Sequence, residues 1–229
     1  MTQFVPEMHE VMPVFKIKDR WSAHTHFAGF ILSIIGMPVL LTKAARFGAT
    51  TGDLVSYSIF MLSMILLYGA STAYHSFRIS DRVDMVLKKF DHLSIFILIA
   101  GSYTPVCTIV LKGTVGVILL RVVWGIAIAG MIFKLFWVTC PRWVSSVLYL
   151  AMGWACAAVL PIIYSIMPAG CFALLTAGGI FYSIGAVIYA IKKPLLRNPE
   201  FGNHELFHCF VLAGSLCHYL MALLYFVHM

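Results

Sequence analysis

The chain alternates between long apolar stretches and short polar breaks. Seven stretches approach or exceed the roughly 20 residues that a helix needs to cross a bilayer: 24–42, 54–77, 90–111, 115–138, 143–167, 170–191 and 204–227. The breaks between them carry charged, glycine or proline residues, which favour turns and helix ends. The stretches are too long for membrane strands and do not alternate with a period of two. The pattern predicts an all-α, polytopic bundle of seven transmembrane helices.

Composition excludes an ordinary soluble domain. Of the 229 residues, 61% are hydrophobic and only 11% are charged, whereas a soluble domain is roughly 25% charged. The breaks are too short to fold alone, so any activity must lie within the bundle. We therefore predict a short cytoplasmic amino-terminal segment, residues 1–20, followed by one seven-helix transmembrane domain, residues 21–229.

The 16 lysines and arginines are distributed unevenly between the two sides of the predicted bundle. Twelve lie on the side of the amino terminus and four on the other. Because positive loops stay in the cytoplasm, the amino terminus of this multi-pass protein is predicted to be cytoplasmic. The compact form favours the bacterial inner membrane over another membrane that faces a cytoplasm. This bias explains the net charge of +7 without a nucleic-acid partner. The twelve on the side of the amino terminus are Lys16, Lys18, Arg20, Arg78, Arg82, Lys88, Lys89, Lys134, Arg142, Lys192, Lys193 and Arg197. The four on the other side are Lys43, Arg46, Lys112 and Arg121.

Histidine and aspartate lie at corresponding ends of three predicted spans. His75 closes the second span, Asp91 opens the third, and His204 and His208 open the seventh. Because successive spans alternate in direction, all four residues are expected at the cytoplasmic side and at one depth. Such residues are costly in hydrocarbon and usually mark a functional site. An error of one span would place them on opposite sides.

The spacing of these residues indicates a metal site. His204 and His208 are four residues apart and share a helix face. A third imidazole from His75 would leave one position for water, as in catalytic zinc sites. Ser71 shares the helix face of His75, and Asp91 would hold or deprotonate the water. The alternatives are a chance H-x-x-x-H pair, a carboxylate that merely stabilises a helix amino terminus, and haem ligation, which a crowded site beside a carboxylate disfavours.

The remaining histidines are expected to have structural roles. His24 and His26 lie at a predicted interfacial helix start, and the alternative for them is a supporting role around the metal ligands. His92 would become a ligand only if Asp91 turned away. His218 lies ten residues beyond His208, which places it about 15 Å further along the helix. We expect it to make a buried polar contact with a neighbouring helix.

Three motifs resemble those of the hemolysin III family, the bacterial branch of the progestin and adiponectin receptor family. They are S-x-x-x-H at residues 71–75, the aspartate of F-D-H-L at residue 91, and H-E-L-F-H at residues 204–208. Residues 21–29 are similar to the family's first-helix motif. However, Ser22 and Ala23 do not supply the acidic residue and asparagine that often precede its Thr-His pair, so no role is assigned to this motif.

The resemblance implies seven helices, a cytoplasmic amino terminus, and zinc bound by His75, His204 and His208. It implies that Asp91 contacts the zinc through water and that Ser71 lies beside it. The wider superfamily includes alkaline ceramidases, which hydrolyse lipid amides, while the bacterial branch was named for a haemolytic, pore-like activity.

Two kinds of function remain open alongside a hydrolase. The first hypothesis is a zinc-dependent intramembrane hydrolase, similar to ceramidases, that cleaves an amide or ester bond of a membrane lipid or lipid-like substrate. The alternatives are a cytolytic channel or pore with a structural zinc, for which the outer half of the bundle offers few polar residues, and a membrane receptor or sensor.

Overall fold

The structure is a computed structural model that describes residues 17–191, 193, 195–196, 198 and 201–229. All regular secondary structure in this part of the chain is helical. The α-helices are α1 (Arg20–Arg46), α2 (Thr51–Ser76), α3 (Asp81–Pro105), α4 (Thr114–Phe136), α5 (Arg142–Gly153), α6 (Leu160–Ile166), α7 (Ala169–Ala190) and α8 (Asn203–Leu224). Seven helical segments are long and apolar enough to cross a membrane. The prediction of an all-α bundle with seven spans is confirmed.

Three of the seven spans are not continuous α-helices, and the seventh ends after α8 in a short 3-10 turn, Phe226–His228. The third span continues beyond Pro105 as a π-helical turn, Val106–Val110, and the fifth joins α5 to α6 through a 3-10 segment, Trp154–Val159. Tyr103 satisfies backbone groups at the break in the fifth span, because its hydroxyl donates to the Gly153 carbonyl at 2.6 Å and accepts from the Cys156 amide at 3.0 Å. Irregular backbone at membrane depth requires internal partners of this kind.

The start of α3 differs from the prediction. We expected this span to begin at residue 90, but the helix begins at Asp81. Ser80 caps it by accepting a hydrogen bond from the Val83 amide, and Asp81 and Asp84 place negative charge in the first turn, where the helix dipole favours it. Asp91 therefore lies almost three turns inside the helix. The alternative in which Asp91 stabilises a helix amino terminus was wrong.

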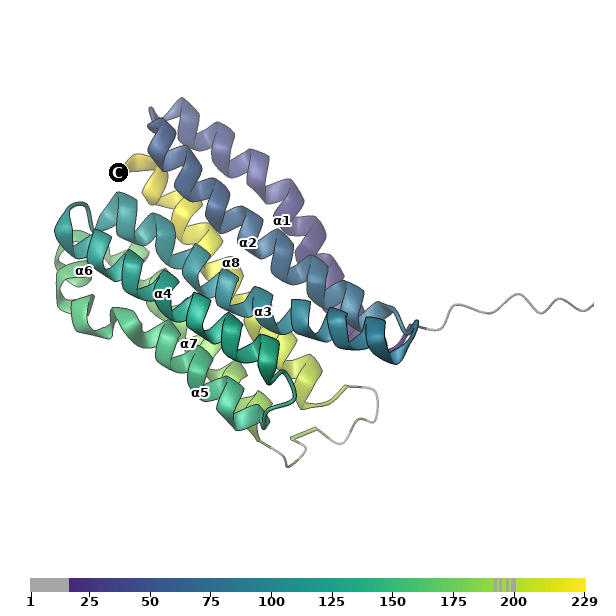
Figure 1. Cartoon of the computed structure of the whole chain (residues 1–229). Coiled ribbons are helices and arrows are strands. Elements are labelled where there is room, and N and C mark those ends of the chain that lie inside the picture. Colours follow the sequence, from purple (N-terminus) through teal and green to yellow (C-terminus); the bar gives the residue numbers. More distant parts are fainter. Residues whose placement is uncertain (1–16, 192, 194, 197, 199–200) are drawn as a thin grey trace, which may run out of the picture.

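The spans pack as a ring in which the last helix returns to the first. α1 lies against α2, α2 against α3, α3 against α5, α5 against α7, α7 against α8, and α8 against α1, while α4 packs on α3 (Figure 1). The end of α2 and the starts of α3 and α8 lie at the same end of this bundle. This topology brings residues from distant parts of the chain to one depth.

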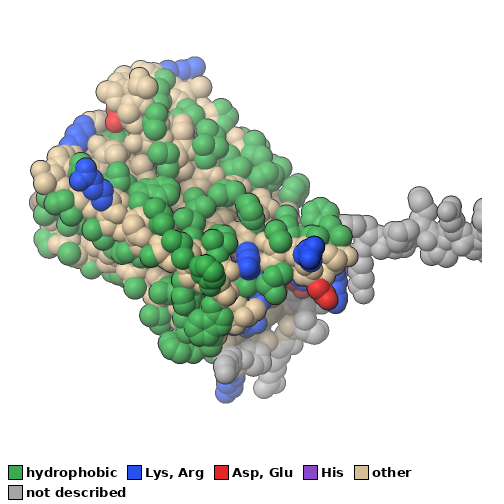
Figure 2. Space-filling model, in the orientation of Figure 1, with side chains coloured by type: hydrophobic (Ala, Val, Ile, Leu, Met, Phe, Trp, Pro, Cys, Tyr) green, Lys and Arg blue, Asp and Glu red, His purple; other side chains and the backbone are tan. Residues whose placement is uncertain are grey.

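The flank of the bundle is apolar. Leu32, Leu62, Ile118 and Phe136 are among its exposed large side chains. Figure 2 shows apolar side chains over much of the visible face, with lysines and arginines toward its ends. Lys16, Lys192, Arg197 and most of the predicted segment 1–20 lie outside the described residues. The domain division and the cytoplasmic amino terminus therefore stay predictions.

One cation is enclosed near the end of α4. Lys134 has no solvent exposure. Its ammonium donates to the Ser145 hydroxyl at 2.6 Å and to the Cys140 sulfur at 3.0 Å. Within the described residues, no carboxylate forms an ion pair with it. Its desolvation is therefore offset only by neutral partners.

We predict that Lys134→Met leaves the melting temperature of the solubilised protein unchanged or raises it, because the substitution removes a buried charge and keeps the volume. Ser145→Ala should instead lower the free energy of unfolding by about 1–3 kcal/mol, because it removes an acceptor from that charge. Thermal unfolding followed by intrinsic fluorescence measures both effects. Ser58→Ala is the control, since its hydroxyl bonds only the Leu54 carbonyl in its own helix. A Lys134→Met variant as unstable as Ser145→Ala would contradict this account.

Candidate metal centre

Three imidazoles meet where α2 ends and α8 begins. His75, His204 and His208 each offer one ligand nitrogen, and these atoms lie within 4.8 Å of one another. The Nε2 atoms of His75 and His204 are 3.1 Å apart, and the rings of His204 and His208 are centred 4.5 Å apart. The convergence predicted from span parity and spacing is found, whereas metal binding itself and the identity of the ion stay predictions.

The first turn of α8 is held by its own polar residues. The Glu205 carboxylate accepts from the Gly202 amide at 2.8 Å, which closes the helix start. The Asn203 side chain donates to the Ile191 and Lys193 carbonyls and accepts from the Leu195 amide. These bonds attach the chain between α7 and α8 to the helix and so fix the positions of the two histidines behind it.

A carboxylate orients His75 from outside the imidazole cluster. Asp19 Oδ2 lies 2.9 Å from His75 Nδ1, and the Asp19 amide donates to the His75 carbonyl at 2.9 Å. A carboxylate only accepts, so Nδ1 carries the proton and the lone pair is on Nε2, which faces His204. The hydrogen bond from His75 holds the pKa of Asp19 below its ordinary value, and the charge of Lys18 adds to this effect.

His208 is oriented in the same way from α1. Its Nδ1 lies 3.3 Å from the Ser22 carbonyl and 3.4 Å from the Thr25 hydroxyl. Because the carbonyl only accepts, Nδ1 donates and Nε2 keeps the lone pair. The Ser22 hydroxyl also donates to Glu205 at 2.6 Å, which ties α1 to the start of α8.

His26 completes this support. Its ring stacks on that of His208 with centroids 3.6 Å apart and an angle of 6° between the planes. It is buried, whereas His24 is exposed. From the sequence, no role was assigned to the first-helix motif, residues 21–29. The structure adds one, because His26 of this motif packs directly on His208. Asp19 was missed altogether. The available signal was an acidic residue seven positions before His26, two helical turns away.

Ser71 and Asp91 lie beside the cluster but outside it. Both are buried, and both line the same cavity as His204 and His208. Asp91 interacts with Ser71 and His75, although no hydrogen bond of good geometry engages the Ser71 hydroxyl. His92 lines the cavity as well, and it does not belong to the set of converging ligand atoms.

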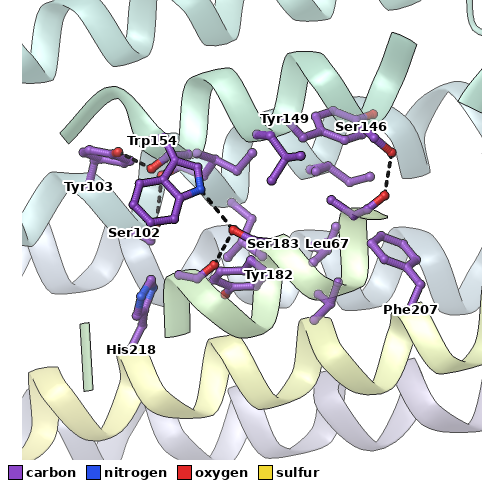
Figure 3. Close-up of a pocket in the computed structure, with 18 of the residues that line it drawn as sticks. Leu67, Ser102, Tyr103, Ser146, Tyr149, Trp154, Tyr182, Ser183, Phe207 and His218 are labelled. Carbon is purple, nitrogen blue, oxygen red and sulfur yellow. Dashed lines mark hydrogen bonds between the residues drawn. The ribbon is translucent and has the colours of Figure 1, made fainter. Parts of the chain in front are cut away.

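The cluster opens into an apolar cavity of about 190 Å³ inside the ring of helices. Its walls come from α1, α2, α3, α5, α6, α7, α8 and the two irregular segments. Leu67, Ile95, Ile99, Leu150 and Val211 supply part of the apolar lining. Figure 3 shows other lining residues, including Trp154 and Tyr182, around this space. The arrangement places a polar cluster at one end of a site suited to an apolar chain.

Comparisons with known proteins agree with the motifs. Residues 16–219 match the family described as Haemolysin-III related. The chain is 41% identical over 216 residues to a Hemolysin-3 homolog of Bacillus subtilis (strain 168), covering 93% of this chain and 97% of that protein. The chain belongs to the hemolysin III family. It is therefore a multi-pass integral membrane protein.

Other relatives extend this family assignment. Hemolysin-3 of Bacillus cereus is 37% identical over 225 residues, which cover 98% of this chain and 94% of that protein. The adiponectin receptor protein of Drosophila melanogaster is 27% identical over 219 residues, which cover 85% of this chain and 48% of that protein. This hemolysin III protein therefore spans about half the length of that animal receptor.

The donor set of this hemolysin III protein fits a zinc ion. Two imidazoles turn protonated Nδ1 atoms toward outside acceptors, which leaves their Nε2 lone pairs unprotonated. The three ligand nitrogens lie within 4.8 Å of one another, and lone pairs on nitrogens this close repel unless a proton or a cation lies between them. A cation relieves all three nitrogens together, and imidazole ligands favour zinc over magnesium. The carboxylate behind His75 is the usual outer partner of a histidine that binds zinc.

We predict that Asp19→Asn weakens zinc binding by about 10–100-fold, because the amide no longer holds His75 in the required tautomer. Competition with chelators of graded zinc affinity measures the change. Asp84→Asn is the matched control, since Asp84 pairs with Lys18 at the same end of the bundle and does not contact the cluster. Equal zinc affinities for Asp19→Asn and the wild type would show that the carboxylate does not support a metal site.

Proposed function

We propose that this protein holds one zinc ion at His75, His204 and His208 and hydrolyses an amide or ester bond of a membrane lipid. The observation that supports the proposal is the convergence of three imidazole nitrogens within 4.8 Å at one end of an apolar cavity. A purely structural zinc site is normally closed by four protein ligands. Three ligands beside a carboxylate and a hydroxyl are typical of a site that acts on a substrate.

Each neighbouring residue has a chemical role in this proposal. Zinc bound by imidazoles would supply Lewis acidity, which polarises a carbonyl group and makes water more acidic. Asp91 would accept a proton from the attacking water and return it to the leaving group. Ser71 would donate a hydrogen bond to the developing oxyanion or orient Asp91.

The cavity favours a substrate with a polar head and a long apolar tail. Its lining near the cluster includes Ser71, Asp91 and His92, whereas Leu67, Ile95 and Leu98 represent the apolar wall. An acyl chain in this space would leave its carbonyl group next to the three histidines. The proposed substrate class is therefore a fatty acyl amide or ester that enters from the bilayer.

We predict that the purified protein contains one zinc per chain, that His208→Ala contains none, and that the wild type releases fatty acid from ceramides or other acyl amides. Asp91→Asn should keep the zinc and lose about 10²–10⁴-fold in rate, because it removes the proton acceptor and keeps the shape. Elemental analysis and fatty acid release are the two measurements.

His24→Ala provides the control, because this histidine is exposed at the same end of the bundle. It should retain both the zinc and the rate. Zinc in His208→Ala would refute the ligand assignment. Equal rates for Asp91→Asn and the wild type would refute the role of Asp91, and a zinc-loaded wild type that releases no fatty acid would refute the hydrolase.

A further inference from the structure

Another histidine, His218, lines the cavity far from the three histidines of the cluster. His218 lies on α8 and lines the cavity, and Figure 3 shows its ring beside the space that Tyr182 and Trp154 also border. It is ten residues beyond His208 on the same helix, about 15 Å further along. Nothing in the proposed hydrolysis uses it.

The polar groups around His218 already have partners. Tyr182 and Tyr68 both bond the Ser215 hydroxyl, at 2.8 Å and 2.6 Å. The other side chains at or near this depth bond backbone carbonyls or one another: Ser102 to Ile99, Thr176 to Phe172, Ser183 to Gly179, Tyr103 to Gly153, and the Trp154 indole to Ser183. Each of these hydroxyl and indole groups therefore has an acceptor for its proton.

His218 keeps one buried nitrogen free. Its Nε2 lies 3.4 Å from the Leu175 carbonyl of α7, while Nδ1 has no hydrogen-bond partner. Among the described cavity residues, the others with an unpartnered buried polar atom are His26, Ser71 and His92, which lie at the end with the metal-binding cluster. His218 is thus the exception at the far depth. An unpaired buried acceptor or donor is costly, so it indicates a missing partner.

The surroundings of His218 determine what that partner must be. A carbonyl only accepts, so the contact with Leu175 places the proton on Nε2 and makes Nδ1 an acceptor. Gly178 leaves the space in which the ring packs against α7, because a Cβ at this position would lie 2.5 Å from the ring atoms Nε2 and Cδ2. A ligand that satisfies Nδ1 must donate a hydrogen bond, and a hydroxyl group does so within an otherwise apolar chain.

We propose that His218 forms a hydroxyl-binding subsite that selects lipids whose acyl chain carries a mid-chain hydroxyl. This inference rests on the proposed function, because that function places the head group of the lipid at the three histidines and so sets the distance from the head group to His218. The hydroxyl would lie about 15 Å from the carbonyl carbon. It would donate to Nδ1, and the chain on either side would contact the apolar wall.

Ricinoleic and oleic acids test the subsite, because they share chain length and double bond and differ in one mid-chain hydroxyl. Equilibrium binding to the purified full-length protein in nanodiscs gives the ratio of their affinities. The wild type should prefer ricinoleic acid by roughly five- to tenfold, the value of one hydrogen bond to a buried acceptor. An oleic acid hydroxylated next to the carboxyl group should show no such preference, because its hydroxyl lies at the wrong depth.

Two variants test the role of the ring. His218→Phe should bring the ratio to about one while keeping affinity for oleic acid, because the ring remains and the acceptor is lost. Gly178→Ala should also lower the ratio, because the new methyl group displaces the ring. His228→Phe is the matched control, as this histidine is exposed beyond the end of the same helix. It should keep the wild-type ratio.

Several results would overturn the subsite. They are a ratio of one in the wild type, a preference that survives His218→Phe, and equal preference for the two hydroxyl positions. Zinc content and hydrolysis of an unsubstituted acyl amide are measured on the same samples and report on the proposed function. A protein that lacks hydrolysis but shows the predicted ratios would refute the hydrolase and still support the subsite.

Discussion

Hydrocarbon cannot accept or donate a hydrogen bond, and this constraint organises the polar residues of the protein. Every buried polar group must find a partner inside the bundle or remain costly. The end of α2 and the start of α8 concentrate three imidazoles that cannot all satisfy one another. α1 and the residue just before it supply the acceptors that hold His75 and His208, namely Asp19 and the Ser22 carbonyl. The site thus depends on the return of α8 to α1 more than on either histidine motif alone.

The distribution of unpaired groups follows from the same constraint. Most hydroxyls in the spans bond a carbonyl of their own helix, as Ser33 and Thr72 do, and so need nothing from a ligand. Among the described residues, five side chains have a buried polar atom that makes no hydrogen bond, and all of them except Asp84 line the cavity: Ser71, His26, His92 and His218. A bundle that only had to be stable would gain by replacing them with apolar residues. Because these unpaired groups line an internal cavity, we infer that they are kept to bind a ligand there although they lower the stability of the bundle.

The sequence predicts the depth of residues better than their direction. Span length and parity were enough to bring His75, His204 and His208 together, because seven long apolar stretches leave one topology for the chain. The rotation of each helix is set by packing, so the sequence could not show that His26 faces the cluster and His24 does not. Asp19 lies just outside an apolar stretch, where only its spacing of seven residues from His26 marks it. The early start of α3 was missed because its first turns are charged, although Ser80 and Asp81 carry a recognisable capping signal.

The break in the fifth span explains how such a cavity can exist within a close-packed bundle. A straight helix from Arg142 to Ile166 would present a continuous ridge to its neighbours. The 3-10 segment interrupts that ridge, and two of its residues, Trp154 and Cys156, line the cavity. The freed backbone groups would be costly in lipid, but Tyr103 bonds the last carbonyl of α5 and the Cys156 amide within the 3-10 segment. Loss of the regular helix is therefore compensated by one side chain of α3, and the space that it opens leads from the three histidines toward His218.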